Sequence, residues 1–212
     1  MTTLFECYGL PLIASRTAGT PEAAAAAAGN LGGRVALKVI APTLVHKTDV
    51  GAVRLGLVAS DVVLEARSLA ESVRAHGHEP TGFLVQPMAP AGVELLLGVV
   101  QDPTFGAVVA CGAGGVNAEV LKDVAVGVTP LTDLDAHDMV RSLRTFPLLD
   151  GFRGAAKCDV PAVEDALLRL SAMVERHPQI AELDANPLVV HPAGALIVDA
   201  RVRVERRAPE TS

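Results

Sequence analysis

The stretch IAELDANPLVVHPAGALIVDARVRV, residues 180–204, has two apolar runs rich in β-branched residues on either side of the turn sequence HPAG. Such runs around a short turn with Pro and Gly predict an antiparallel hairpin. A four-residue turn would pair Val190 with Ala195, and this register places Asn186 directly opposite Asp199. Facing side chains have Cβ atoms roughly 4.5–5.5 Å apart. The hairpin therefore predicts an amide oxygen and a carboxylate that converge on one face.

The oxygen atoms on this face indicate a metal site. Asp184 lies two residues before Asn186 and is therefore expected on the same face of the strand. Hard oxygen ligands that are too few to enclose an ion are typical of Mg²⁺ that carries a nucleotide polyphosphate. The alternative is a plain cross-strand hydrogen bond between Asn186 and Asp199 at the surface, and the residues alone leave both interpretations open.

Between this hairpin and the middle of the chain, strands and helices follow one another. Residues 93–101 and 107–115 are two apolar runs around the turn DPTFG, and they predict a second hairpin. Residues 132–144 and 161–176 have apolar side chains at helical spacing, which predicts two amphipathic helices. The second half of the chain is thus expected to contain hairpins covered by helices.

The first half has its own set of elements. Thr20 as N-cap, Pro21 at the first helical position and a closing pair of glycines predict a helix. The elements expected in this half are helices at 20–33 and 60–77 and strands at 34–40, 52–57 and 82–89. Strand pairs interleaved with helices in both halves indicate an α+β fold with two lobes, and the break is expected near residues 86–92.

Two basic side chains of the first half could take part in chemistry. The segment LVHKTDVGAV, residues 44–53, joins two predicted strands, and it is either a solvated turn or a place where His46 reacts. Lys38 lies inside an apolar strand. It is either an edge-strand lysine whose head reaches solvent or a cation directed at phosphate oxygens.

The segment GAGGVNAE, residues 112–119, follows a predicted strand and contains Gly112, Gly114 and Gly115. Such a loop can wrap a phosphate with its backbone N–H groups, although a turn that needs positive φ is the alternative. The glycine spacing fits neither a Walker loop nor the dinucleotide fingerprint. Glu94 lies among aliphatic residues, where a carboxylate has either a partner or a place on a solvent face.

Composition excludes several classes of protein. The 18 Lys and Arg against 24 Asp and Glu give a net charge of −6, and one Tyr, five Phe and no Trp argue against a nucleic-acid surface. Cys7, Cys111 and Cys158 have no CxxC spacing, so reduced thiols are expected. The N-terminus has no basic region of a signal peptide. We expect a soluble cytoplasmic chain with neither a membrane span nor a nucleic-acid partner.

Taken together, these segments resemble the ATP-grasp domain of the ADP-forming acyl-CoA synthetases (acetate–CoA ligases), which is related to the β subunit of succinyl-CoA synthetase. The resemblance covers nearly the whole chain. The segments that carry it are YGLP (8–11), ALKVIAPTLVHKTDVGAVRLGL (36–57), LVQPMAPAGVELLLGVVQDPTFG (84–106), GAGGVNAEVLKDV (112–124), ELDANPLVV (182–190) and VDAR (198–201).

The resemblance implies an ATP-grasp fold, in which two α+β lobes clamp a nucleotide. The implied division is a small nucleotide lobe at about 20–87, a larger metal-binding lobe at about 88–205 with 1–19 packed on it, and a tail at 206–212. Lys38 would contact the nucleotide phosphates, and the segment VQPM (85–88) would be the hinge that holds adenine, with Gln86 and the backbone of Met88. Glu94 would bind the ribose hydroxyls or the base side of the pocket.

The resemblance also assigns the remaining site residues. His46 would be the phosphoryl carrier of this chain, Asn186 and Asp199 would hold Mg²⁺, and the glycine loop would bind phosphate. The chain departs from the family where a second glycine usually follows Gly51, because Ala52 stands there. If that position needs positive φ, Ala52 would strain the loop.

The implied function is that of an acid–CoA ligase that forms ADP and passes a phosphoryl group between ATP or ADP and an acyl phosphate. No segment resembles a CoA-binding domain, so a CoA-binding partner subunit or domain is expected. One alternative is a nucleotide-sensing regulatory domain of an acetyltransferase system. Another is an ATP-grasp ligase that makes an acyl phosphate directly, although the VHKTD segment disfavours it because such enzymes need no phosphohistidine.

Overall fold

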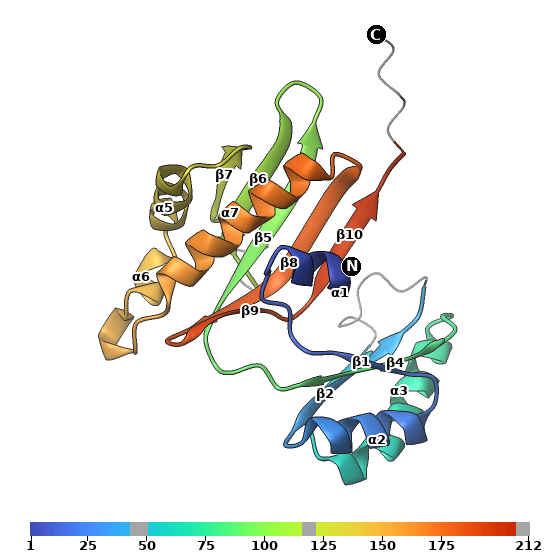
Figure 1. Ribbon diagram of the computed structural model, residues 1–212. Helices are drawn as coiled ribbons and strands as arrows, with labels where there is room; N and C mark the ends of the chain where they lie inside the picture. Colours follow the sequence, from blue (N-terminus) through green and yellow to red (C-terminus); the bar gives the residue numbers. More distant parts are fainter. Residues whose placement is uncertain (43–50, 116–121, 207–212) are drawn as a thin grey trace. The chain divides into compact units, whose positions relative to one another are not determined.

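The computed structural model describes residues 1–42, 51–115 and 122–206 of the chain. The chain forms two compact units, one of Ile13–Met88 and one of Met1–Leu12 together with Ala89–Ser212 (Figure 1). Each unit has its own sheet and its own hydrophobic core. Both units combine helices with antiparallel sheet, which gives the α+β class expected from the sequence.

The smaller unit contains a four-stranded antiparallel sheet in the order β1-β4-β2-β3. Its elements are β1 (Arg16–Ala18), α2 (Pro21–Leu31), β2 (Val35–Ile40), β3 (Val53–Leu57), the 3-10 turn η1 (Ala59–Asp61), α3 (Val62–Ala75) and β4 (Gly82–Pro87). The predicted start of α2 is confirmed, because Thr20 Oγ1 accepts a hydrogen bond from the Ala23 N–H at 3.1 Å. Residues 13–18 belong to this unit and not, as expected, to the larger one, because β1 pairs with β4.

Helices α2 and α3 cover one face of this sheet. The core between them contains Ala24 and Ala28 of α2, Val62, Ala66, Leu69 and Val73 of α3, and Val35, Leu37, Val39, Phe83 and Val85 of the sheet. Successive side chains of a strand point to opposite faces. Lys38, between Leu37 and Val39, therefore lies on the face opposite the helices.

The larger unit contains a second antiparallel sheet in the order β10-β8-β5-β6-β7, with β9 pairing beside β8. Its elements are α1 (Thr2–Cys7), β5 (Val93–Asp102), β6 (Gly106–Ala113), β7 (Val124–Val128), α5 (Asp133–Ser142), α6 (Phe146–Leu149), η2 (Phe152–Gly154), α7 (Val160–Arg176), β8 (Ile180–His191), β9 (Gly194–Ile197) and β10 (Ala200–Val204). Figure 1 shows α7 lying across one face of this sheet. Strand β7 was not predicted from the sequence.

The final hairpin has the predicted register. Val190 pairs with Ala195, although the strands continue to His191 and Gly194, so that two residues turn where four were expected. The second strand of the predicted hairpin is divided into β9 and β10. The pairing of Ala200 with Ala185 keeps the same register across this interruption.

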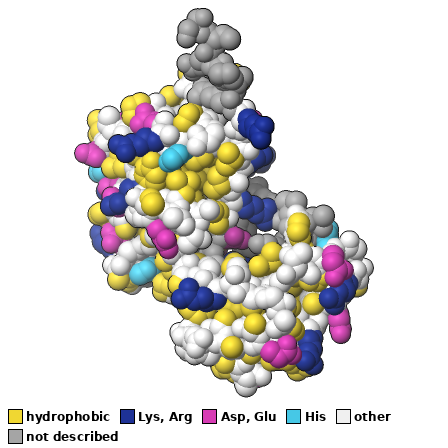
Figure 2. All heavy atoms as spheres, turned by 45° about the vertical axis from the view of Figure 1, so that its right-hand side comes forward, with side chains coloured by type: hydrophobic (Ala, Val, Ile, Leu, Met, Phe, Trp, Pro, Cys, Tyr) yellow, Lys and Arg dark blue, Asp and Glu magenta, His cyan; other side chains and the backbone are white. Residues whose placement is uncertain are grey.

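The structure also describes the distribution of charge on the surface and the state of the cysteines. On the face drawn in Figure 2, basic and acidic side chains are interspersed. All three cysteines are free thiols, and burial together with the negative charge of Asp123 raises the pKa of the Cys111 thiol to about 12. Within the described ranges, no helix combines the length and apolar character that crossing a membrane requires.

Candidate functional site

In the smaller unit, Lys38 and Gln86 lie on the same face of the sheet. Lys38 pairs with Leu84 of β4 and Val53 of β3, so its strand is an interior one, and the residue is only 7% exposed. The alternative of an edge-strand lysine that reaches solvent is therefore wrong. Gln86 is 3% exposed, and its Nε2 donates a hydrogen bond to Ser15 Oγ at 2.9 Å. Side chains fixed on interior strands are held firmly enough to position a ligand.

Met88 follows β4 at the end of the same unit. Its N–H donates a hydrogen bond to the Arg34 carbonyl at 3.2 Å, and its Sδ accepts one from the Gly56 N–H at 3.2 Å. The side chain is 41% exposed. Because the Met88 N–H is already bonded, it is not the backbone group that would meet a nucleotide base.

In the larger unit, the glycine loop meets Glu94 and Asn186. The Gly114 N–H donates to the Glu94 carbonyl at 2.9 Å, and a Cβ at Gly114 would overlap the Leu95 carbonyl. Gly115 has φ +60°, and a Cβ there would collide with the Glu94 carboxylate. The Gly115 N–H donates to Asn186 Oδ1 at 3.1 Å. Three segments that are far apart in the sequence thus meet at one point.

Gly112 has a different position from the other two glycines of the predicted loop. It lies inside β6, opposite Leu96 of β5 and Val124 of β7. The loop proper therefore begins at Gly114. Residues 116–119 of the predicted loop lie outside the described residues.

Asn186 and Asp199 are opposite one another, as the register predicts. The Asn186 N–H donates to the Asp199 carbonyl at 3.1 Å. The Asp199 carboxylate accepts the Ala200 N–H at 3.0 Å. The amide oxygen of Asn186 accepts one bond from Gly115 and has a second lone pair available by its chemistry. The two side chains therefore supply an amide oxygen and a carboxylate at one point of the hairpin.

Asp184 adds a second carboxylate near this pair. Partial burial raises its pKa, the positive charge of Arg201 lowers it, and the negative charge of Asp199 raises it again. The strand register places Asp184 diagonally across the hairpin from Asp199, and a divalent cation between two such carboxylates would relieve their repulsion. Among the described residues, no group of three His, Cys, Asp or Glu side chains could hold a metal alone. The donor set fits a cation that also binds phosphate oxygens.

Asp123 is a buried residue at this site that the sequence did not indicate. It is 6% exposed, and its carboxylate accepts hydrogen bonds from the Arg144 N–H at 2.9 Å and from the Thr145 N–H and hydroxyl at 2.8 Å each. Its carbonyl accepts the Ala113 N–H at 2.9 Å. Burial acts to raise the pKa of the carboxyl, but the hydrogen bonds and the Arg144 charge outweigh it and hold the pKa below its usual value.

Replacement of Asp123 by asparagine is expected to lower the free energy of unfolding at pH 7 by about 1–3 kcal/mol, because the amide cannot accept all three bonds. The lowered pKa means that this stabilisation is present above the unfolded-state pKa of about 3.9 and is lost as pH falls through the folded-state pKa. Urea unfolding of Asp123→Asn and wild type should show a difference in the free energy of unfolding that becomes smaller below about pH 4. Asp138→Asn, at an exposed position, is the control. A difference in unfolding free energy that does not vary with pH would show that the ionised Asp123 carboxylate does not provide this stabilisation.

The segment expected to carry the phosphoryl group, with His46, lies outside the described residues. The residues that follow it are described. Gly51 has φ +64°, whereas Ala52 is not among the residues with positive φ. Ala52 is fully buried, and its carbonyl accepts the Val39 N–H at 3.0 Å. The replacement of the second glycine by Ala52 therefore introduces no strain at that position.

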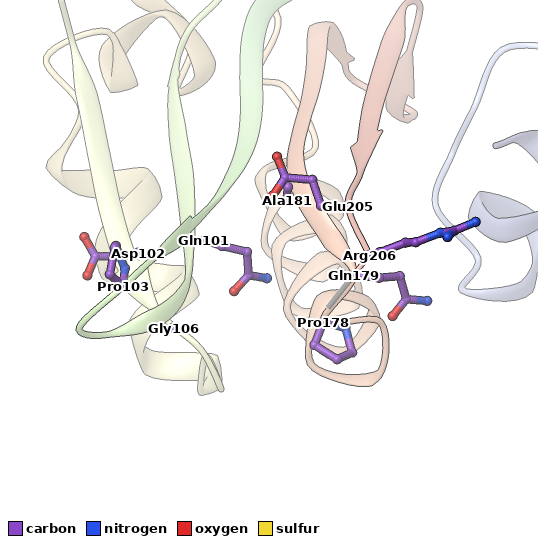
Figure 3. Close-up of a pocket in the computed structure, with 9 residues that line it drawn as sticks. All are labelled: Gln101, Asp102, Pro103, Gly106, Pro178, Gln179, Ala181, Glu205 and Arg206. Atoms are coloured by element: carbon purple, nitrogen blue, oxygen red, sulfur yellow. The ribbon is translucent and has the colours of Figure 1, made fainter. Parts of the chain in front are cut away.

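Two hollows of the larger unit lie at different places relative to Glu94 and the glycine loop. The one in Figure 3, of about 510 Å³, is lined by Gln101 and Asp102 at the end of β5 that is farthest from Glu94. A smaller hollow of about 390 Å³ is lined by Glu94, Ala113 and Phe152, among others. The second hollow adjoins the glycine loop, because Ala113 directly precedes Gly114.

Comparison with known proteins gives a matching family and similar ADP-forming ligases. Residues 1–204 match the family of ATP-grasp domains. The chain is 37% identical over 203 residues to acetate–CoA ligase (ADP-forming) I of Archaeoglobus fulgidus, a match that covers 94% of this chain and 29% of the relative. It is 32% identical over 202 residues to the β subunit of acetate–CoA ligase (ADP-forming) I of Pyrococcus furiosus, with 94% of this chain and 87% of that subunit covered.

Solved structures show the same fold. Acetyl-coenzyme A synthetase 1 of Ca. Korarchaeum cryptofilum, in complex with coenzyme A and Ca-AMPCP, matches with a TM-score of 0.92 and 38% identity over 96% of this chain and 90% of that chain. A second structure of that protein contains coenzyme A and Mg-AMPPCP, and its phosphohistidine segment points towards the nucleotide-binding site. Its TM-score is 0.83 at 36% identity, with the same coverage.

Proposed function

The chain belongs to the family of ATP-grasp domains, and from this premise we propose that it is the nucleotide-handling part of an ADP-forming acid–CoA ligase. The complete enzyme would convert acyl-CoA, ADP and phosphate into carboxylic acid, CoA and ATP, reversibly. The observation that carries the proposal is the meeting of the glycine loop with Asn186 and Asp199 in the larger unit. The relatives from Archaeoglobus fulgidus and Pyrococcus furiosus have ADP-forming ligase activity in their names.

In the proposed reaction the phosphoryl group moves in three steps. Phosphate displaces CoA from the acyl-CoA and gives an acyl phosphate. A ring nitrogen of His46 then bonds to phosphorus, and the carboxylate leaves. A β-phosphate oxygen of ADP finally takes the phosphoryl group from His46 and gives ATP. A neutral imidazole supplies the lone pair for the second step, and a phosphohistidine can give up its phosphoryl group again.

Each described site residue has one part in this proposal. Lys38 would bind nucleotide phosphates, because its place on an interior strand fixes the sheet face from which this cation projects. Gln86 and Met88 would hold adenine, with Met88 contributing groups other than its N–H. The exposed carboxylate of Glu94 would accept hydrogen bonds from ribose hydroxyls or from the base side of the nucleotide.

The glycine loop and the metal ligands of the proposal lie in the larger unit. The glycine loop that starts at Gly114 would bind phosphate oxygens. The hydrogen bonds from the Gly114 and Gly115 N–H groups to Glu94 and Asn186 would fix where this loop begins. Asn186 and Asp199 would hold Mg²⁺, which supplies charge neutralisation and a template for in-line transfer when it is bound. The repulsion between Asp184 and Asp199 supports this assignment, because a cation would lower it.

A partner is part of the proposal. The chain spans 29% of the single-chain ligase from Archaeoglobus fulgidus and 87% of the separate subunit from Pyrococcus furiosus. The acyl and CoA groups would therefore be bound by another domain or subunit. The three cysteines of this chain are free thiols, which agrees with the reducing cytoplasm, where we place the protein.

The purified chain is expected to bind Mg-ATP and Mg-ADP and to form no acyl-CoA until the CoA-binding subunit or domain from the same organism is added. Calorimetry measures the first property, and a coupled ADP-release assay with CoA and short carboxylic acids measures the second. Steady acyl-CoA formation by the chain alone would contradict the division of labour. Tight nucleotide binding without turnover in the presence of the partner would instead favour a nucleotide-sensing domain.

A further inference from the structure

One face of the larger sheet is covered by helices, and the other is partly apolar. Leu95, Leu97 and Val99 of β5 point into the core formed with α7, as Val109 and Cys111 of β6 do. The residues between them point to the opposite face because side chains alternate along a strand. On β5, β6 and β7 this second face has nine positions in three rows, which are Val100, Val108 and Val128, then Gly98, Ala110 and Val126, then Leu96, Gly112 and Val124.

All nine positions are aliphatic or glycine, and four of the valines are well exposed. Val100 is 52% exposed, Val124 49%, Val126 66% and Val128 50%. An antiparallel sheet with one face in water normally has polar side chains on that face. We refer to these nine positions as the valine face. Contiguous exposed apolar surface on a folded protein marks an interaction site.

The neighbouring strands of the same sheet have a different character on this face. Arg203 of β10 forms an ion pair with Glu182 of β8 at 2.7 Å, and Arg201 is opposite Asp184. The open face thus divides into a charged part on β8 and β10 and the valine face on β5, β6 and β7. Strand β7 is also the last strand of the described sheet, so the valine face extends to a sheet edge, where strands are open to further pairing.

We propose that the valine face is the surface on which the CoA-binding subunit or domain packs, an inference that rests on the proposed function. The part of the relatives that matches this chain is 29% of a single chain in one of them and most of a separate subunit in another. A domain that works in both arrangements needs a lasting interface with the rest of the enzyme. Lasting interfaces are more apolar than transient ones and are poor in charge at their centre, as the valine face is.

Position also favours this occupant over a second copy of the chain. Gly98, in the middle row, pairs with Asp184 of β8 on one side and with Ala110 on the other. Adjacent strands are about 4.8 Å apart, so Val126 is about 14 Å across the sheet from Asp184. A CoA-binding partner on the valine face would therefore lie beside the residues to which a phosphoryl group has to be delivered.

The test introduces one buried charge into this surface. Val126→Glu is expected to weaken binding of the CoA-binding partner at least about tenfold, because an unpaired carboxylate would be desolvated at the interface. Coupled acyl-CoA formation at limiting partner should fall by a similar factor. Binding of Mg-ATP by the chain alone should not change. Leu64→Glu, at a position of α3 that is 72% exposed, is the matched control and should leave partner binding unchanged.

The outcomes separate this inference from the proposed function. If wild-type chain and partner form an active complex and Val126→Glu binds the partner as Leu64→Glu does, the valine face is not the interface and the proposed function stands. If the wild-type chain instead forms a dimer that Val126→Glu dissociates, the occupant is a second copy, and the inference is overturned. Failure of the wild-type pair to make acyl-CoA would overturn the proposed function on which the inference rests.

Discussion

Replacement of His46 by asparagine is expected to lower coupled acyl-CoA formation with the partner by more than about a thousandfold, a magnitude typical for loss of a covalent nucleophile. Asparagine is similar in size and polarity, but its amide nitrogen has no lone pair that can take a phosphoryl group. The same variant should lose the acid-labile, base-stable phosphate that wild type acquires from Mg-ATP. Its affinity for Mg-ATP should remain close to that of wild type, because the lost group acts after nucleotide binding.

A matched histidine controls for the loss of an imidazole in general. His137 lies on the exposed side of α5, where its Nδ1 is 3.4 Å from Glu164 Oε1. His137→Asn should keep both the label and the coupled activity. If His46→Asn also keeps full activity with its partner, His46 is an ordinary residue of a charged connection, and the phosphoryl group takes another route.

Replacement of Asp199 by asparagine is expected to weaken Mg-ATP binding at least about tenfold, since loss of even an indirect metal partner costs 10–100-fold. The change keeps the shape of the side chain and removes one negative charge from the candidate metal site. The register with Asn186 and the backbone hydrogen bond between the two residues should persist. The effect should therefore appear as a higher magnesium requirement at unchanged thermal stability.

A charge-matched control lies on the same strand as Asn186. Glu182→Gln removes one carboxylate from β8 at the Arg203 ion pair and leaves the Asn186 and Asp199 pair intact. Magnesium titrations of nucleotide binding by both variants provide the comparison. Equal magnesium dependence in Asp199→Asn and Glu182→Gln would show that Asp199 does not hold the metal.

The features that the sequence predicted well depend on local rules. The N-cap of α2 follows from Thr20 and Pro21 alone, and the register of Val190 with Ala195 follows from a short turn between two runs of period two. That register was enough to place Asn186 opposite Asp199. The roles of His46 and the other site residues came from the family resemblance and remain predictions.

The features that the sequence did not predict depend on neighbours that are distant in the chain. Lys38 is buried because β4, more than forty residues later, pairs beside its strand. Asp123 is a site residue only because the turn at Arg144 folds back onto it. Strand β7 has the sequence VAVGV, and its small residues and exposed valines lack the polar alternation by which an exposed strand is recognised.

Phosphopeptide mapping of the wild-type chain, after incubation with Mg-ATP that carries radioactive phosphate in the γ position, locates the phosphoryl carrier directly. The label should be on the peptide that contains His46, and added Mg-ADP should discharge it with recovery of radioactive ATP, because the transfer is reversible. Label on a different residue, or label on His46 that Mg-ADP leaves in place, would contradict passage of the phosphoryl group through His46.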